Sequence, residues 1–121
     1  MAKDEILNAA EMDAAEAEAE QIDSVGVYTH EFKKPFTCEG NTYESLTFNF
    51  DSLSGADSLA IENEMMALGK PLVAPEFSGE YLIRMAAKAA KISSTVIEAM
   101  PLADYNRIRS HARTFLLKSG S

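Results

Sequence analysis

The sequence predicts an α+β fold, in which an N-terminal β-hairpin is followed by a small bundle of three to four helices. Apolar and polar residues alternate between residues 25 and 50, which is typical of strands with one solvated face. Beyond residue 50 the apolar residues recur at helical spacing, with prolines and glycines between the helical stretches. Residues 1–24 differ from both parts, because they are rich in alanine and glutamate. We therefore expect a flexible or helical acidic arm over residues 1–24 and one α+β domain over residues 25–121.

Residues 25–50 carry the signals of a hairpin, since aromatic and β-branched residues dominate them. A turn is expected at residues 38–41, where Gly40 and Asn41 can adopt positive φ. Pro35 cannot donate a backbone hydrogen bond, so it marks an edge position or the end of a strand. The apolar face expected from the alternation consists of Tyr28, His30, Phe32, Leu46, Phe48 and Phe50.

Helical periodicity and capping residues predict the helices at about residues 55–68, 79–92, 94–100 and 102–117. Ser54 suits the N-cap of the first helix, and Gly69 suits the position just after its end. Pro101 suits the first residue of the last helix. The first helix has two apolar stripes, which is typical of a helix between other elements. One stripe consists of Ile61, Met65 and Leu68, and the other of Leu59 and Met66. The second is apolar over more than half of its circumference, with a basic ridge facing outward.

The net charge of −8 is unevenly distributed. Residues 1–24 hold eight acidic residues and one lysine, whereas residues 78–121 hold seven basic residues and three acidic ones. The acidic first two-thirds makes nucleic acid an unfavourable partner, because phosphate neutralisation needs clustered Lys and Arg. We interpret the arm as a solvated segment. The alternative is an arm that becomes helical on a basic surface, either of a partner or of the chain's own C-terminal third.

No residue pattern indicates catalysis, a metal site or a cofactor site. His30 and His111 lack metal-ligand spacing, and we interpret them as half-buried packing and as a solvated helical residue. Cys38 could be a nucleophile only if a neighbouring group lowered the pKa of its thiol, and no local signature indicates such a group. We therefore expect a protein that is not an enzyme and that uses no cofactor and no metal.

The N-terminus lacks the basic start and the apolar middle of a secretory signal. The longest apolar stretches are far shorter than the ~20 residues that a bilayer requires. With a single cysteine no internal disulfide can form, which suits a reducing compartment. The sequence thus predicts an intracellular protein without a membrane partner.

Two features of the helical part are candidates for a binding surface. Flexible methionine side chains suit adaptable apolar grooves, and core packing is the alternative for them. A basic ridge on the second helix, formed by Arg84, Lys88 and Lys91, could dock an acidic partner helix or the arm, and a solvated face is the alternative. Arg107, Arg109 and Arg113 could extend this ridge. The predicted partner-binding residues are Met65, Met66, Tyr81, Arg84, Met85, Lys88 and Lys91.

The order of the segments is itself distinctive. FKKPFTCEGNTYESLTFNF holds a strand, a proline, a Gly-centred turn and a second strand rich in Leu and aromatic residues. An acidic helix follows in DSLSGADSLAIENEM, and next come the helix of EYLIRMAAKAAKIS, the turn MPLADY and a last helix that ends in TFLL. This arrangement, over roughly residues 27–117, resembles the tail assembly chaperones of long-tailed bacteriophages and prophages.

The resemblance implies a non-structural protein of virion assembly. Such a chaperone binds the long helical tape-measure protein and keeps it soluble while the tail tube polymerises. The tail-tube protein is implied as a second partner, through a longer frameshifted form. The resemblance also implies the host bacterial cytoplasm and absence from the mature virion. An open hairpin edge could additionally support self-association. The alternative function, suggested by the arm, is an acidic regulatory adaptor or nucleic-acid mimic that occupies a basic groove.

Overall fold

A computed structural model of the chain describes residues 25–119. Its two strands are β1 (Val27–Cys38) and β2 (Asn41–Asn49). Its α-helices are α1 (Gly55–Ala67), α2 (Gly79–Ala90), α3 (Ser94–Glu98) and α4 (Leu102–Ser119). Two 3-10 turns, η1 (Phe50–Ser52) and η2 (Pro75–Phe77), precede α1 and α2. The predicted α+β class, with a hairpin followed by four helices, is confirmed, and the predicted arm lies outside the described residues.

The two strands pair antiparallel around a two-residue turn. Glu39 and Gly40 have φ of 52° and 83°, as a tight hairpin turn of this length requires. Positive φ was expected at Asn41, but this residue instead begins β2. β1 runs through Pro35, where the register shifts between Glu31 and Phe36. The proline therefore lies at an irregularity on the edge of a two-stranded sheet.

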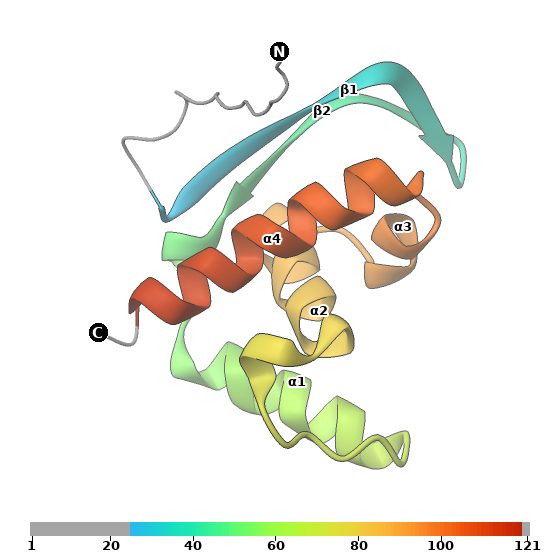
Figure 1. Cartoon of the computed structure of the whole chain (residues 1–121). Coiled ribbons are helices and arrows are strands. Elements are labelled where there is room, and N and C mark those ends of the chain that lie inside the picture. The colour runs from blue at the N-terminus through green and yellow to red at the C-terminus, as the bar shows by residue number, and fades with distance from the viewer. Residues whose placement is uncertain (1–24, 120–121) are drawn as a thin grey trace.

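One face of the hairpin lies over the helices (Figure 1). Phe48 and Phe50 are completely buried on this face, and Phe50 stacks on Phe115 of α4 with ring centroids 5.3 Å apart. A two-stranded hairpin is marginal in water by itself, so the helices supply the apolar surface that it needs. The predicted apolar face is thus the face that packs.

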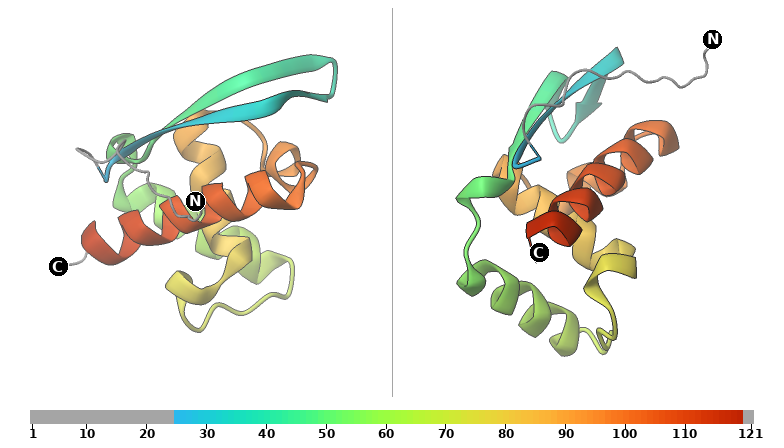
Figure 2. Two further views of the ribbon diagram at one scale, coloured as in Figure 1. Left: turned by 45° about the horizontal axis from the view of Figure 1, so that its top comes forward. Right: turned by 60° about the vertical axis from the view of Figure 1, so that its left-hand side comes forward.

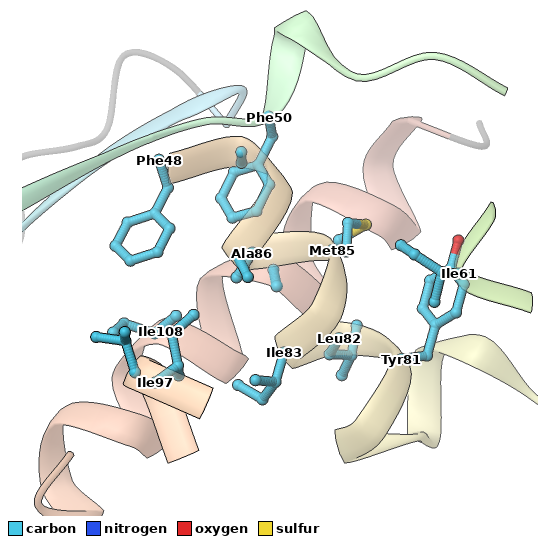
Figure 3. Packing of buried hydrophobic residues seen from close by; sticks show 14 of the residues in the cluster. Phe48, Phe50, Ile61, Tyr81, Leu82, Ile83, Met85, Ala86, Ile97 and Ile108 are labelled. Atoms are coloured by element: carbon cyan, nitrogen blue, oxygen red, sulfur yellow. The ribbon is translucent and has the colours of Figure 1, made fainter. Parts of the chain in front are cut away.

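α2 is the central helix and lies between the hairpin and α1 (Figure 2). The Ser78 side chain caps it by accepting the Tyr81 N–H at 3.1 Å. In Figure 3, Phe48 of β2 and Phe50 of η1 lie on one side of Ala86, and Ile97 and Ile108 lie on another. The predicted wide apolar arc is therefore covered on several sides. The buried residues of α2 are Tyr81, Leu82, Ile83, Met85, Ala86, Ala87 and Ala89.

α1 lies at the periphery and has α2 as its main neighbour. The Ser54 N–H donates to the Asp57 carboxylate at 2.8 Å, which fixes the first turn. At the other end Gly69 has a φ of 73°, and the Lys70 N–H donates to the Met65 carbonyl at 2.8 Å. These contacts form the C-terminal motif that a glycine at this position permits. Both predicted ends of α1 are therefore correct to within one residue.

The packing of α1 differs from the prediction in one respect. Ile61 and Met65 are buried against the core, but Leu59 and Met66 on the other stripe are 61% and 74% exposed. The expectation that both apolar stripes would be covered is wrong, because no other described element packs on the outer side of α1 to a similar extent. This uncovered stripe is the feature from which we build the candidate site.

Candidate functional site

The seven predicted partner-binding residues do not form one surface. Met65, Tyr81 and Met85 belong to the core and are 2%, 3% and 4% exposed. Their methionine and tyrosine side chains therefore pack internally, which is the alternative that the sequence left open. Met66, next to Met65 in the chain, is rotated from it by ~100° around the axis of α1, and its side chain is exposed. The role of all seven residues in partner binding stays a prediction, but three of them are inaccessible in this conformation.

The predicted basic ridge of α2 is interrupted. Arg84 donates to Glu64 of α1 at 3.0 Å and to Glu80 at 3.1 Å, so its charge is balanced by two carboxylates. The hydrogen bond from Arg84 is the largest cause of the lowered pKa of Glu80. Lys91 has a left-handed φ of 60° that ends α2, so it does not continue the helical stripe. Of the three ridge residues on α2, the half-buried Lys88 and the exposed Lys91 form no ion pair with a described carboxylate.

The exposed apolar residues of α1 extend into the segment that follows it. An open groove of about 630 Å³ lies between α1 and residues 70–75. Met66, Leu72 and Val73 provide apolar lining, and Val73 is 93% exposed. We call Leu59, Met66 and Val73, together with this groove, the α1 surface. Pro71 and Pro75 also line it, and both restrict the backbone of the segment that forms its outer wall.

Charged residues lie at the edge of the groove in the α1 surface. Glu62 lines the groove on the α1 side and Lys70 lines it near the C-terminal end of the helix. Lys70 also donates to Glu80 at 3.2 Å. An apolar floor with charged groups at its margin is the arrangement by which grooves bind amphipathic helices. The apolar lining suits recognition of apolar side chains.

A second, smaller groove of about 270 Å³ lies between the start of α1 and the end of α4. Tyr81 and Met85 form part of its lining, so two of the predicted residues approach the surface here although they are buried. The Tyr81 hydroxyl lies 2.6 Å from the Ser58 hydroxyl, which links α2 to α1. This groove is a seam between packed elements, whereas the α1 surface is an uncovered face.

The hairpin contains a buried polar cluster that links it to α4. His30 is completely buried, with Nε2 2.7 Å from Asp104 and Nδ1 2.7 Å from the Tyr28 hydroxyl. Burial lowers the pKa of His30 and outweighs the opposing effect of Asp104, so the ring is neutral at pH 7. Because the carboxylate can only accept, Nε2 donates to Asp104 and Nδ1 accepts from Tyr28. The interpretation of His30 as half-buried packing is therefore wrong.

His111 of α4 stacks on Tyr28 of β1, with ring centroids 3.6 Å apart and ring planes within 9°. Burial of the ring, followed by the nearby charge of Arg107, lowers the pKa of His111 to about 4. The edge of the ring still reaches solvent, and the phenol of Tyr28 shields one face. His111 is thus an exposed residue of α4, as expected, but one face of its ring packs on Tyr28. The Tyr28–His30–Asp104 contacts hold β1 on α4 and leave His30 no exposed area for a substrate.

Sequence reasoning missed this cluster because His30 and Asp104 are 74 residues apart. Its only sequence signal is the i, i+2 placement of Tyr28 and His30 on one face of a strand. Cys38 lies half-buried at the end of β1. Among residues 25–119, no group of three or more His, Cys, Asp or Glu side chains could hold a metal ion.

Comparisons of the chain with protein-family models, with curated proteins and with solved structures found no match. Over the part of the chain that the structure describes, no helix combines the length and apolar character needed to cross a membrane.

Proposed function

We propose that this protein is a tail assembly chaperone of a long-tailed bacteriophage or prophage. It binds the tape-measure protein in the host bacterial cytoplasm and keeps it soluble while the tail tube polymerises, with the tail-tube protein as a second partner. The observation that carries the proposal is the uncovered apolar side of α1 beside an open groove. The succession of one hairpin and four helices supports it, because this is the order that the resemblance implies.

The α1 surface suits a helical client. Leu59 and Met66 are seven residues apart, so they lie on one side of α1 two turns from each other. A client helix with an apolar stripe would cover both and would fill the groove at Val73. Burying one such side chain contributes roughly 1.5–3 kcal/mol. The flexible thioether of Met66 adapts to different apolar neighbours, which a long client with varying sequence requires.

The experiment is co-expression of the full chain with its tape-measure protein. The readouts are the soluble fraction of the tape-measure protein and the dissociation constant of a purified client segment. The test variant is Leu59→Glu with Met66→Glu, and the control is Leu102→Glu, which changes an apolar residue that is 70% exposed on α4. We expect the test variant to weaken binding by about 30-fold, as loss of an interface hot spot does, and the control to bind like the wild type.

Three outcomes separate the alternatives. If the wild type neither binds the tape-measure protein nor raises its solubility, the chaperone proposal is wrong. If it does both and the α1 variant is unimpaired, the function stands but the α1 surface is not its site. The acidic adaptor or nucleic-acid mimic makes a different prediction: replacing the eight acids of residues 1–24 with amides would abolish partner binding, whereas a chaperone with an apolar site would keep it.

A further inference from the structure

A notch between α4 and η2 brings two arginines together with an exposed aromatic ring. It measures about 470 Å³ and shares no lining residue with the groove of the α1 surface. We call it the arginine notch. Its lining residues are Glu76, Phe77, Asn106, Arg109, Ser110 and Arg113.

Arg113 is held in place by two contacts with η2. Its Nε donates to the Glu76 backbone carbonyl at 3.2 Å, and its guanidinium carbon lies 5.1 Å from the centroid of the Phe77 ring. No ion pair between described residues involves this guanidinium. Its position is therefore fixed by a backbone carbonyl and a ring, neither of which neutralises its charge. A preorganised guanidinium of this kind suits a carboxylate, which it can bind with two parallel hydrogen bonds.

Arg109 adds positive charge at the start of α2. Its guanidinium carbon lies 3.6 Å from the position that a side chain on Gly79 would occupy, against the first residue of that helix. The N-terminal end of a helix already carries a partial positive charge. Glu80, the acid in this first turn, pairs with Lys70 and Arg84 instead. Of the residues that line the notch, Glu76 is the one acid, so two arginines and a helix end oppose a single carboxylate.

We propose that the arginine notch binds the chain's own acidic arm, residues 1–24. The arm carries eight acidic residues and one lysine, which complements the arginines. The described chain also begins beside the helix that carries them. The Gly26 carbonyl accepts a hydrogen bond from the Asp51 N–H at 3.1 Å, and the preceding residue, Phe50, stacks on Phe115 of α4.

The arm is long enough to reach the notch. α4 has 18 residues and therefore spans ~27 Å, whereas 24 residues can extend to ~80 Å. Because the arm is part of the same chain, its effective concentration at the notch is of millimolar order. This favours the arm over an acidic peptide free in solution. The contacts are solvent-exposed charge pairs, so the docked state is expected to be sensitive to salt.

The test uses the full chain in which Cys38→Ser removes the native thiol and Ala14→Cys carries a nitroxide. We expect the nitroxide to broaden the amide signals of residues 106–113 and of η2 in ¹⁵N spectra. About 1 M salt, where the Debye length is ~3 Å, should restore them. Arg109→Glu with Arg113→Glu should also restore them. The matched control is Lys88→Glu with Lys91→Glu, which makes the same change of charge at the end of α2 and should leave the broadening in place.

A second variant does not depend on the folding of the arginine variant. Changing the eight acids of the arm to amides leaves residues 25–119 intact and should likewise abolish the broadening. The proposal is overturned if α4 shows no broadening, or if the broadening survives in the arginine and amide variants. A mixing experiment combines a nitroxide-bearing chain without ¹⁵N and a ¹⁵N chain without a nitroxide. The proposal is also overturned if the ¹⁵N signals broaden in this mixture, since the arm would then bind a second copy. No client is present, so the result is independent of the chaperone proposal.

Discussion

α1 and α2 are alike in length but differ in what their apolar residues do. They have 13 and 12 residues, and each begins after a serine that takes part in an N-terminal hydrogen bond. α2 buries seven residues, whereas α1 buries only Ile61 and Met65. The cause is position, because α2 lies between the hairpin and α1, and α1 has no comparable neighbour on its outer side (Figure 2). α2 therefore holds the fold together, whereas α1 presents a surface.

The largest effect on the free energy of unfolding is expected in α2, whose apolar residues are buried in the core. Leu82 of α2 is completely buried, so Leu82→Ala removes apolar contacts and leaves a cavity. We expect a loss of about 2–5 kcal/mol in the free energy of unfolding, measured by urea denaturation followed by circular dichroism. A loss below about 1 kcal/mol would contradict the central role of α2.

The next largest effect tests whether the contact between the hairpin and α4 also contributes to the free energy of unfolding. Asp104→Ala removes the acceptor of the buried His30 Nε2–H. An unsatisfied buried donor costs about 1–3 kcal/mol, and we expect a loss of that size in the same denaturation experiment. Asp104→Asn is the control, because its amide oxygen can still accept. Equal losses in both variants would mean that the carboxylate charge, and not the acceptor, matters.

The pH dependence of stability probes the same attachment. His30 and His111 have pKa values below 6.5 in the fold, chiefly because of burial. The unfolded chain therefore binds more protons between pH 6.5 and 4, so the free energy of unfolding is highest above pH 6.5 and falls toward pH 4. His111→Phe keeps a ring against Tyr28 and removes one titrating group. Its urea midpoints should fall less steeply from pH 6.5 to pH 4 than those of the wild type. An unchanged slope would contradict the lowered pKa of His111.

The smallest expected effect concerns the exposed side of α1, which can be compared with the buried side of the same helix. Met66 is exposed and its neighbour Met65 is buried, so the two alanine variants form a matched pair. We expect Met66→Ala to change the free energy of unfolding by less than about 0.5 kcal/mol, and Met65→Ala to lower it by about 2–5 kcal/mol. Thermal and urea unfolding measure both. Similar losses would show that the outer side of α1 is covered in solution.

Much of the fold could be predicted because its signals are local. Alternation around Phe48 predicted the hairpin, and Ser54 and Gly69 predicted the ends of α1. The candidate site was less predictable. The sequence grouped Met65 with Met66 as one adaptable surface, but Met65 is buried in the core and Met66 is exposed. Periodicity identifies two apolar stripes and cannot say which of them another element will cover.

The sequence by itself determined the α+β class, the order of hairpin and helices and their approximate limits. These features depend on capping, turn chemistry and periodicity, which act over a few residues. Only the tertiary structure decided that His30 bonds to Asp104, that Arg84 is balanced by Glu64, and which stripe of α1 stays uncovered. Each of these joins or separates residues far apart in the chain. Their proximity follows from how the layers pack around α2, and no local pattern specifies it.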